Sequence, residues 1–282
     1  MGSVRMLSPH PQWVDSLHGY VRPYWDELLQ GEWAEGVACT QLSIPEMRGW
    51  ILQIYPFIHA FPKFLAEALI KVEDDESRSF LIDNIRVEKA HAEHWIWMGM
   101  GFGLKKEEML ALAEGSRPVL RDVQSLTDWL WYINTKGSLA EAVAATSFAI
   151  EGMAGDIARK VTPGFEAYRD HAGVEMGPKT YKWFREHAQY DDHHPKIALE
   201  IVKRYATTEK MQTRAMVAAK RSIQLLHNAL LTAYQAYSPA QEPGESIDAD
   251  KRASDRRAQQ LRLAFPDRRF RERRGFKSRK VA

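Results

Sequence analysis

The chain has 282 residues and a formal net charge of +2, and 45% of its residues are hydrophobic and 27% are charged. This composition is ordinary for a globular protein, and it excludes a collagen, a coiled-coil rod and a wholly disordered chain. Cys39 is the only cysteine, which excludes a disulfide framework and thiolate-rich zinc or iron–sulfur sites. The longest apolar segment, 95–104, is too short to span a bilayer, and no secretory signal is recognisable, so we expect a soluble cytoplasmic protein.

Apolar residues recur at spacings of three and four as far as about residue 238, and this periodicity predicts helices throughout. Ser43 and Glu46 form a capping-box pattern, and Pro56 and Pro62 are expected to kink or interrupt the helix that follows. The predicted helices are Gln12–Leu29, Ser43–Ala68, Phe80–Gly103, Lys105–Ala113, Val119–Thr135, Ser138 to the residue before Pro163, Thr180–Ala206 with a bend at Pro195, and Thr208–Tyr237. Residues 1–238 are therefore predicted to form one all-α domain.

The end of the chain differs from the rest in charge. Residues 251–282 contain 13 Lys/Arg against 3 Asp/Glu, whereas the first 250 residues contain 26 against 34. This basic segment has few apolar residues, so it cannot bury enough surface to offset the entropy lost on ordering. We expect 239–282 to be a linker followed by a disordered, solubilising basic tail. The alternative is that 251–282 binds nucleic acid or an anionic surface through its arginines.

The segment 187–194 places several metal-ligand side chains on one helix face. At 100° per residue, His187, Asp191 and His194 form a single stripe. Two imidazoles and a carboxylate are the donors that suit iron or manganese. The alternative is a solvated polar patch, because neighbouring residues such as Glu186 are polar as well.

A second pattern is Glu88-Lys-Ala-His91. The spacing of three places Glu88 and His91 on one helix face, and Glu-x-x-His is an element of di-iron carboxylate bundles. Such a pair is often simply exposed, but the apolar residues around it indicate a buried helix. His94 is a competing ligand that lies on the far side of His91 from Glu88.

The third element is Glu151, which lies on a helix face of small and apolar residues. A carboxylate there must be paired or metal-bound, and the alternative to a metal is a buried ion pair with Lys or Arg. The three patterns together offer three carboxylates and three imidazoles from three helices. That number suits two iron ions that share a bridging carboxylate, whereas a closed structural zinc site fits less well.

The order of these residues resembles that of the haem-oxygenase-like di-iron oxidases and oxygenases. That superfamily has seven or more helices, and it shares its fold with thiaminase-like (TenA) and pyrroloquinoline-quinone-forming (PqqC) proteins. The strings Asn84–Trp95, Ala144–Gly152 and His187–Pro195 are similar to those of the undecene-forming fatty-acid decarboxylases (UndA type), and the likeness covers about residues 40–205. Much of the superfamily has a Glu at the position of Asn84, and this departure favours the decarboxylase branch.

The resemblance implies a centre with two Fe(II) ions per chain, or manganese in their place. One iron would be held by Glu88, His91 and His187, and the other by Glu151, Asp191 and His194, with a carboxylate bridging. It also implies that O2 is a co-substrate. The second substrate would be a small carboxylic acid, a medium-chain fatty acid that lies in an apolar tunnel and is converted to CO2 and a terminal alkene.

Other functions remain open from the sequence. A related di-iron enzyme could act on an amino acid or amine, by N-oxygenation or C–C cleavage, and a short cavity with a charged clamp would favour it. A non-catalytic metal carrier or nucleic-acid-binding protein is a second alternative. A thiaminase-like hydrolase has little support, because Cys39 lies in no recognisable motif. The sequence leaves open whether the chain forms a homodimer.

Overall fold

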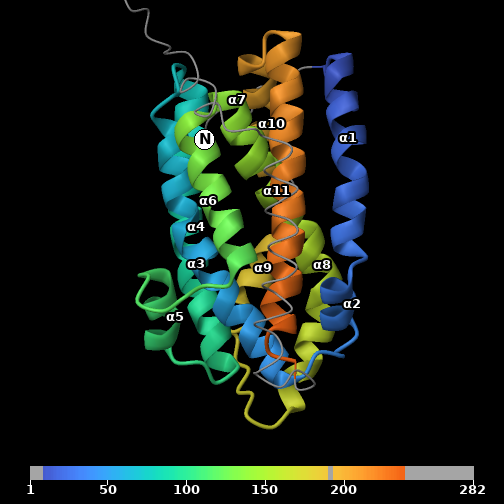
Figure 1. Cartoon of the computed structure of the whole chain (residues 1–282), viewed down its shortest axis with the longest axis vertical. Helices are drawn as coiled ribbons and strands as arrows, with labels where there is room; N and C mark the ends of the chain where they lie inside the picture. The colour runs from blue at the N-terminus through green and yellow to red at the C-terminus, as the bar shows by residue number, and fades with distance from the viewer. Residues whose placement is uncertain (1–8, 190–192, 239–282) are drawn as a thin grey trace, which may run out of the picture. The chain divides into compact units, whose positions relative to one another are not determined.

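The computed structural model describes residues 9–189 and 193–238, and all regular secondary structure in these ranges is helical, which confirms the predicted all-α class. The long helices lie side by side, and α11 packs against both α1 and α6 (Figure 1). The elements are α1 (Gln12–Leu29), α2 (Glu32–Ala38), α3 (Ile44–Leu69), α4 (Asp75–Gly101), α5 (Lys106–Ala113), α6 (Arg121–Lys136), α7 (Leu139–Val143), the π-helix η1 (Ala144–Glu151), α8 (Gly152–Ala167), the 3₁₀-helix η2 (Tyr168–Asp170), α9 (Lys182–Gln189), α10 (His193–Tyr205) and α11 (Glu209–Gln235).

Helix α3 begins with the predicted capping box. The Ser43 side chain accepts the N–H of Glu46 at 3.4 Å, and the Glu46 carboxylate accepts the N–H of Ser43 at 2.7 Å. The helix then runs through Pro56 and Pro62 without ending. Its apolar residues pack against α4, α5, α6 and α11, and this burial outweighs the roughly 3 kcal/mol that an internal proline costs. Neither proline interrupts the helix.

Helix α4 begins earlier than the predicted start at Phe80. The Asp74 carboxylate accepts the N–H of Ser77 at 2.9 Å and so caps the first turn. The hydroxyl of Tyr205, at the end of α10, donates to the other oxygen of Asp74 at 2.7 Å. A polar cap and a distant tyrosine thus extend the helix beyond its apolar pattern.

The helix predicted from Ser138 consists of α7, the π-helix η1 and α8, and α8 continues past Pro163. Pro163 is exposed, so water can solvate the carbonyl group that it leaves without a helical partner. A Cβ at Gly164 would lie 2.2 Å from the carbonyl oxygens of Val37 and Ala38. This close packing of α8 on α2 supports the helix beyond the proline, and the prediction that it ends before Pro163 is wrong.

The helix predicted over Thr180–Ala206 is described as two helices, α9 and α10, on either side of residues 190–192. Pro195 lies in the first turn of α10, where a missing N–H removes no intrahelical hydrogen bond. Helix α9 packs against α4 and α8, and α10 packs against η1 and α7. His187 and His194 therefore meet different neighbours.

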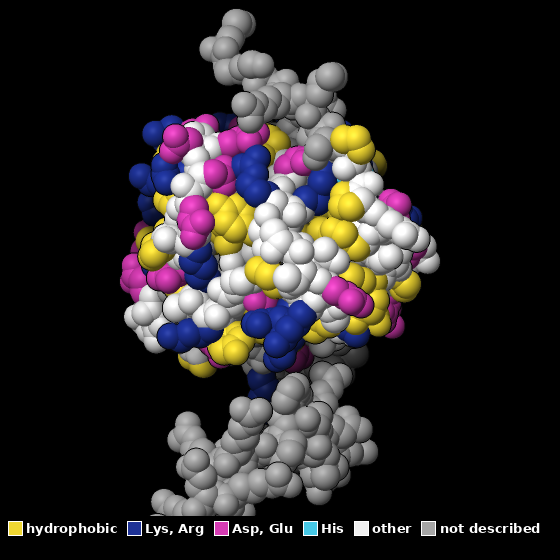
Figure 2. All heavy atoms as spheres, turned by 90° about the horizontal axis from the view of Figure 1, so that it is seen from above, with side chains coloured by type: hydrophobic (Ala, Val, Ile, Leu, Met, Phe, Trp, Pro, Cys, Tyr) yellow, Lys and Arg dark blue, Asp and Glu magenta, His cyan; other side chains and the backbone are white. Residues whose placement is uncertain are grey.

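The short helix α2 was not predicted, because its seven residues are too few to show a periodicity. None of the described helices is both long and apolar enough to cross a membrane. On the face drawn in Figure 2, positive and negative side chains are interspersed with hydrophobic ones. Residues 239–282 lie outside the described residues, so the domain boundary at 238 and the basic tail stay predictions.

Candidate metal centre

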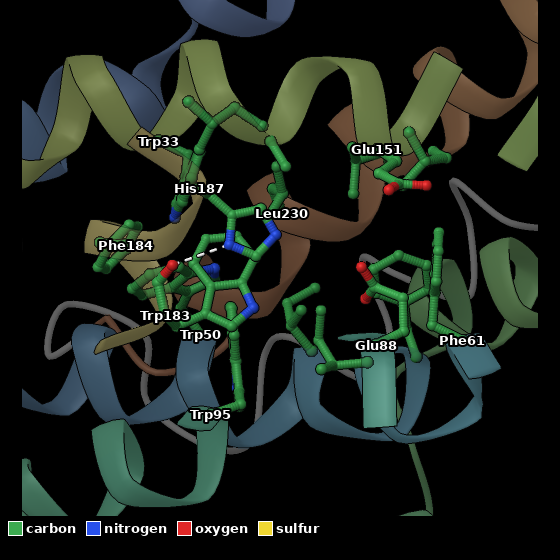
Figure 3. A pocket seen from close by; sticks show the side chains of 17 residues that line it. Trp33, Trp50, Phe61, Glu88, Trp95, Glu151, Trp183, Phe184, His187 and Leu230 are labelled. Carbon is green, nitrogen blue, oxygen red and sulfur yellow. Dashed lines mark hydrogen bonds between the residues drawn. The ribbon is translucent and has the colours of Figure 1, made fainter. Parts of the chain in front are cut away.

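The structure brings five of the six predicted ligand side chains to one region of the bundle interior. Helix α4 contributes Glu88 and His91, the end of η1 contributes Glu151, and α9 and α10 contribute His187 and His194. Figure 3 shows the carboxylates of Glu88 and Glu151 facing each other across a cavity. The sixth predicted ligand, Asp191, lies outside the described residues.

The first ligand cluster consists of Glu88, His91 and His187. All three are buried, and one ligand atom from each lies within 4.8 Å of the others. His91 Nδ1 is 3.0 Å from Glu88 Oε1, and the two imidazole rings are 4.2 Å apart at their centres. His187 Nδ1 donates to the carbonyl oxygen of Trp183 at 2.8 Å, which leaves Nε2 as the ring nitrogen that could bind a metal ion.

The second ligand cluster consists of Glu151 and His194, supported by Asn84. His194 Nδ1 is 2.7 Å from Glu151 Oε1, and Asn84 Nδ2 donates to Glu151 Oε2 at 2.7 Å. The Glu151 side chain is 7% exposed and that of His194 is 22% exposed. Glu151 is the last residue of the π-helix, a rare form that is frequent at functional sites. Asn84, at a position where much of the superfamily has a Glu, orients this carboxylate.

The two carboxylates experience opposite electrostatic environments. Burial by itself would raise the pKa of Glu88, but the ion pair and hydrogen bond with His91 outweigh it and lower that pKa. Burial raises the pKa of Glu151, and the charge of Glu88 adds to this effect against the opposing hydrogen bond from His194. Like charges that face each other in the interior need a cation between or beside them.

The three histidines also differ. Burial, together with the charge of His91, lowers the pKa of His187 to about 3, so this imidazole is neutral at physiological pH. The pKa values of His91 and His194 are raised despite burial, because each faces a carboxylate, Glu88 and Glu151 respectively. Neutral imidazole is the form that binds a metal ion, so a metal at either of these two would displace a proton.

The donors present fit iron. In the described part of the chain the ion pairs of Glu88 and Glu151 are with histidines and not with Lys or Arg. Among the described residues, the carboxylates of Glu88 and Glu151 therefore have no permanently charged Lys or Arg as a partner. The possible metal-binding atoms around them are imidazole nitrogens and carboxylate oxygens. That set suits iron or manganese.

A further buried group adjoins His91 and was not among the predicted ligands. His94 Nδ1 lies 2.9 Å from Glu186 Oε2, and the same oxygen is 3.6 Å from His91 Nε2. His94 is 3% exposed, so it is an interior residue and not part of a solvated face. His94 could be recognised as a candidate from its position one helical turn after His91, whereas Glu186 looked like any polar neighbour of His187.

The cavity beside the carboxylates is apolar. About 60 Å³ of it can hold the centre of a water-sized sphere, and the cavity is partly open to solvent. Glu88, Glu151 and His187 are the ionisable residues in its lining. The remaining lining residues are apolar or aromatic: Trp33, Trp50, Ile54, Phe57, Ile58, Phe61, Trp95, Ile150, Ala154, Ile157, Trp183, Phe184, Leu226 and Leu230.

A sequence profile of a family described as iron-containing redox enzyme matches residues 48–227, a range that includes every predicted ligand. The chain belongs to this family. Among curated proteins it is similar to the 4-aminobenzoate synthases of Chlamydia trachomatis and Chlamydia muridarum. The first is 28% identical over 61% of this chain and 70% of its own length, and the second is 27% identical over the same shares.

Solved structures support the family assignment at the level of the fold. A TenA homologue from Pseudomonas syringae is 28% identical, has a TM-score of 0.71, and matches 83% of this chain and 98% of its own. A domain of unknown function with a haem-oxygenase-like fold, from Shewanella denitrificans, is 17% identical, with a TM-score of 0.66 and 79% and 93% coverage. The predicted haem-oxygenase-like, TenA-like fold is confirmed.

Proposed function

We propose that the chain is an O2-dependent oxidase with two iron ions. Glu88, His91 and His187 would hold one ion, and Glu151 and His194, with Asp191, would hold the other. The observation that carries the proposal is the pair of buried carboxylates that face each other across the cavity. They are neutralised by histidines in the described part of the chain and adjoin an otherwise apolar space.

Iron bound here would supply O2 activation and an open position for a carboxylate. The chain supplies orientation and a dry environment. The Trp183 carbonyl group fixes the tautomer of His187, and Asn84 holds one oxygen of Glu151 in place. Apolar walls exclude water and strengthen every electrostatic interaction inside the cavity.

The chemistry of the cavity favours a carboxylic acid with an apolar body as substrate. A charged headgroup can be neutralised only at the end where Glu88, Glu151 and their metal ions lie, and the rest of the lining is hydrocarbon and aromatic ring. An amine would compete with the metal ions for the same two carboxylates. We therefore favour an acid over the amino acid or amine alternative.

The reaction that we propose is oxidative decarboxylation, as in the undecene-forming decarboxylases that the sequence resembles. A medium-chain fatty acid would lose one hydrogen from its β-carbon and its carboxyl group as CO2, leaving a terminal alkene. The substrate gives up two electrons and two protons, and O2 accepts them to give hydrogen peroxide, so the step needs no further reductant.

The test is an anaerobic titration with Fe(II), followed by exposure to O2 with a panel of fatty acids and headspace analysis for alkenes. We expect saturation near two irons per chain and one alkene, one carbon shorter than its acid. Binding of two irons without a volatile product would support the metal centre and refute the decarboxylation. Failure to bind iron would refute both.

A second candidate reaction follows from the similarity to the Chlamydia 4-aminobenzoate synthases. Formation of an aromatic amino acid in this centre would be compatible with a cavity walled by tryptophan and phenylalanine rings. The test supplies, in place of the fatty acids, an aromatic carboxylic acid as the source of the ring and an amine as the source of the nitrogen. After exposure to O2, chromatography with mass detection would identify 4-aminobenzoate. Alkene from the fatty acids without 4-aminobenzoate from this mixture would exclude this candidate.

A further inference from the structure

Two tryptophan side chains in the cavity wall carry hydrogen-bond donors that the protein does not use. Trp33, in α2, is 3% exposed, and Trp50, in α3, is 1% exposed. In the described part of the chain neither indole Nε1–H has an acceptor. Both residues line the cavity beside the metal centre.

Two other buried indoles of this protein have hydrogen-bond acceptors. Trp95 Nε1 donates to the carbonyl oxygen of Ile51 at 2.8 Å, and Trp129 Nε1 donates to the hydroxyl of Ser222 at 2.8 Å. A buried donor without an acceptor is rare in folded proteins and unfavourable, because its hydration is lost without replacement. Two such donors in the wall of one cavity indicate that a ligand supplies the acceptor.

The two indoles lie together and apart from the carboxylates. The rings of Trp33 and Trp50 are 5.1 Å apart at their centres and tilted by 54°. In Figure 3 they lie on the opposite side of the view from Glu88 and Glu151. The cavity therefore has a carboxylate end, where metal ions would bind, and an indole end with two free donors.

We propose that the indole end is a subsite for a neutral hydrogen-bond acceptor, most simply a carbonyl oxygen with its two lone pairs. This inference rests on the proposed function for the orientation of the substrate, whose carboxyl group binds at the other end. The substrate is then an acid with an apolar middle and an oxygen acceptor remote from its carboxyl group. A second anion is disfavoured, because the ionisable lining residues are Glu88, Glu151 and His187, and none is a Lys or Arg.

The test compares two ligands of equal length. One is decanoic acid, and the other is the keto acid of the same length whose carbonyl group stands next to the terminal methyl. Calorimetry on the Fe(II)-loaded protein without O2 measures both affinities, so no turnover is needed. The quantity of interest is the ratio of the two affinities, which cancels the contribution of the shared carboxyl group.

The variants W33F and W50F remove one N–H each and keep an aromatic ring. Each should lower the relative affinity for the keto acid about tenfold, the effect of one buried hydrogen bond, while decanoic acid binds nearly as before. The matched control is W129F, which removes an indole outside the cavity and should leave the ratio unchanged. An unchanged ratio in both W33F and W50F overturns the proposal.

A neutral pair of ligands separates this proposal from the proposed function. 2-Decanone and 1-decene need neither iron nor a carboxylate site, and their binding to the metal-free protein is followed through the indole N–H resonances. If neither acid binds but the ketone shifts the resonances of Trp33 and Trp50, the proposal of an acid substrate is refuted and the proposal of an acceptor subsite is supported. If the ketone leaves both resonances unchanged, the subsite is wrong.

Discussion

The two ligand clusters of the proposed metal centre are built in different ways. In the first, Glu88 and His91 are one turn apart on a regular α-helix, and His187 is buried beside them. In the second, Glu151 ends a π-helix and His194 lies in the first turn of α10, where its side chain is 22% exposed. Regular helix geometry thus preforms one cluster, whereas the other depends on irregular backbone and on contacts between distant segments. We expect the first cluster to bind iron more tightly.

Loss of Glu88 should have the largest effect. In Glu88→Ala the first cluster keeps its two imidazoles but loses the carboxylate that neutralises the bound ion and pairs with His91. We expect the iron affinity of this cluster to fall by about 100-fold or more and turnover to be lost. Even residues that only hydrogen-bond to a metal ligand contribute about 10- to 100-fold to metal affinity. Anaerobic calorimetry with Fe(II) measures the effect. Two irons bound with wild-type affinity would contradict the assignment.

Loss of Glu151 should affect iron binding at the second cluster only. Glu151→Ala is expected to abolish binding of one iron and leave the other, because the first cluster does not share a hydrogen bond with this side chain. Glu93→Ala, an exposed carboxylate on the same helix as Glu88, is the matched control and should still bind two irons. An unchanged stoichiometry in Glu151→Ala would remove this residue from the centre.

The pH dependence of stability should have opposite signs for His187 and His194. His187 has a folded-state pKa of about 3, so on acidification below about pH 6.5 the unfolded chain takes up a proton that the folded chain refuses. Stability falls there by about 1 kcal/mol per pH unit, and His187→Gln should remove this fall. His194 has a raised pKa, so its contribution is present at low pH and is lost as pH rises through that value.

Denaturation of the metal-free protein by urea, from about pH 8 to about pH 5, tests both signs. In His194→Gln the loss of stability on acidification should be steeper than in the wild type, because the favourable protonation is gone. Parallel pH profiles of the two variants would show that the electrostatic difference between His187 and His194 is absent.

Asn84→Ala should have a smaller effect, confined to the second cluster. It removes the hydrogen bond to Glu151 Oε2 and so loosens the orientation of that carboxylate. We expect the affinity for the second iron to fall about tenfold while the first is unaffected. Asn84→Asp serves as a companion, because it keeps an oxygen at the site but adds a negative charge. Equal losses at both irons in Asn84→Ala would contradict the separation.

Glu186→Gln should have the smallest effect, on the first cluster only. The Glu186 carboxylate lies 3.6 Å from His91 Nε2, and its side chain is 32% exposed, so solvent screens part of its influence. We expect iron affinity to fall by about tenfold or less, because Glu186 would act only through its contact with His91. A loss as large as that in Glu88→Ala would mean that Glu186 is itself a ligand.

Much of this protein could be predicted from local patterns. The capping box at Ser43 and the spacing of Glu88 and His91 depend on neighbours along the chain, so the sequence alone determines them. The apolar surroundings of Glu151 also predicted its burial. In each case the physical cause, a turn of helix or a hydrophobic face, lies within about two turns of the residue concerned.

Other features depend on the packing of the helices and involve residues far apart in the sequence. The hydrogen bond from Asn84 to Glu151, the approach of Gly164 to α2 and the continuation of α8 past Pro163 all depend on packing between segments. No pattern in the sequence could show that two indole donors would lack acceptors, because burial and partners are set only when helices pack. The chain thus encodes its candidate ligands locally, whereas their hydrogen-bond partners and the cavity beside them arise from the packing of the helices.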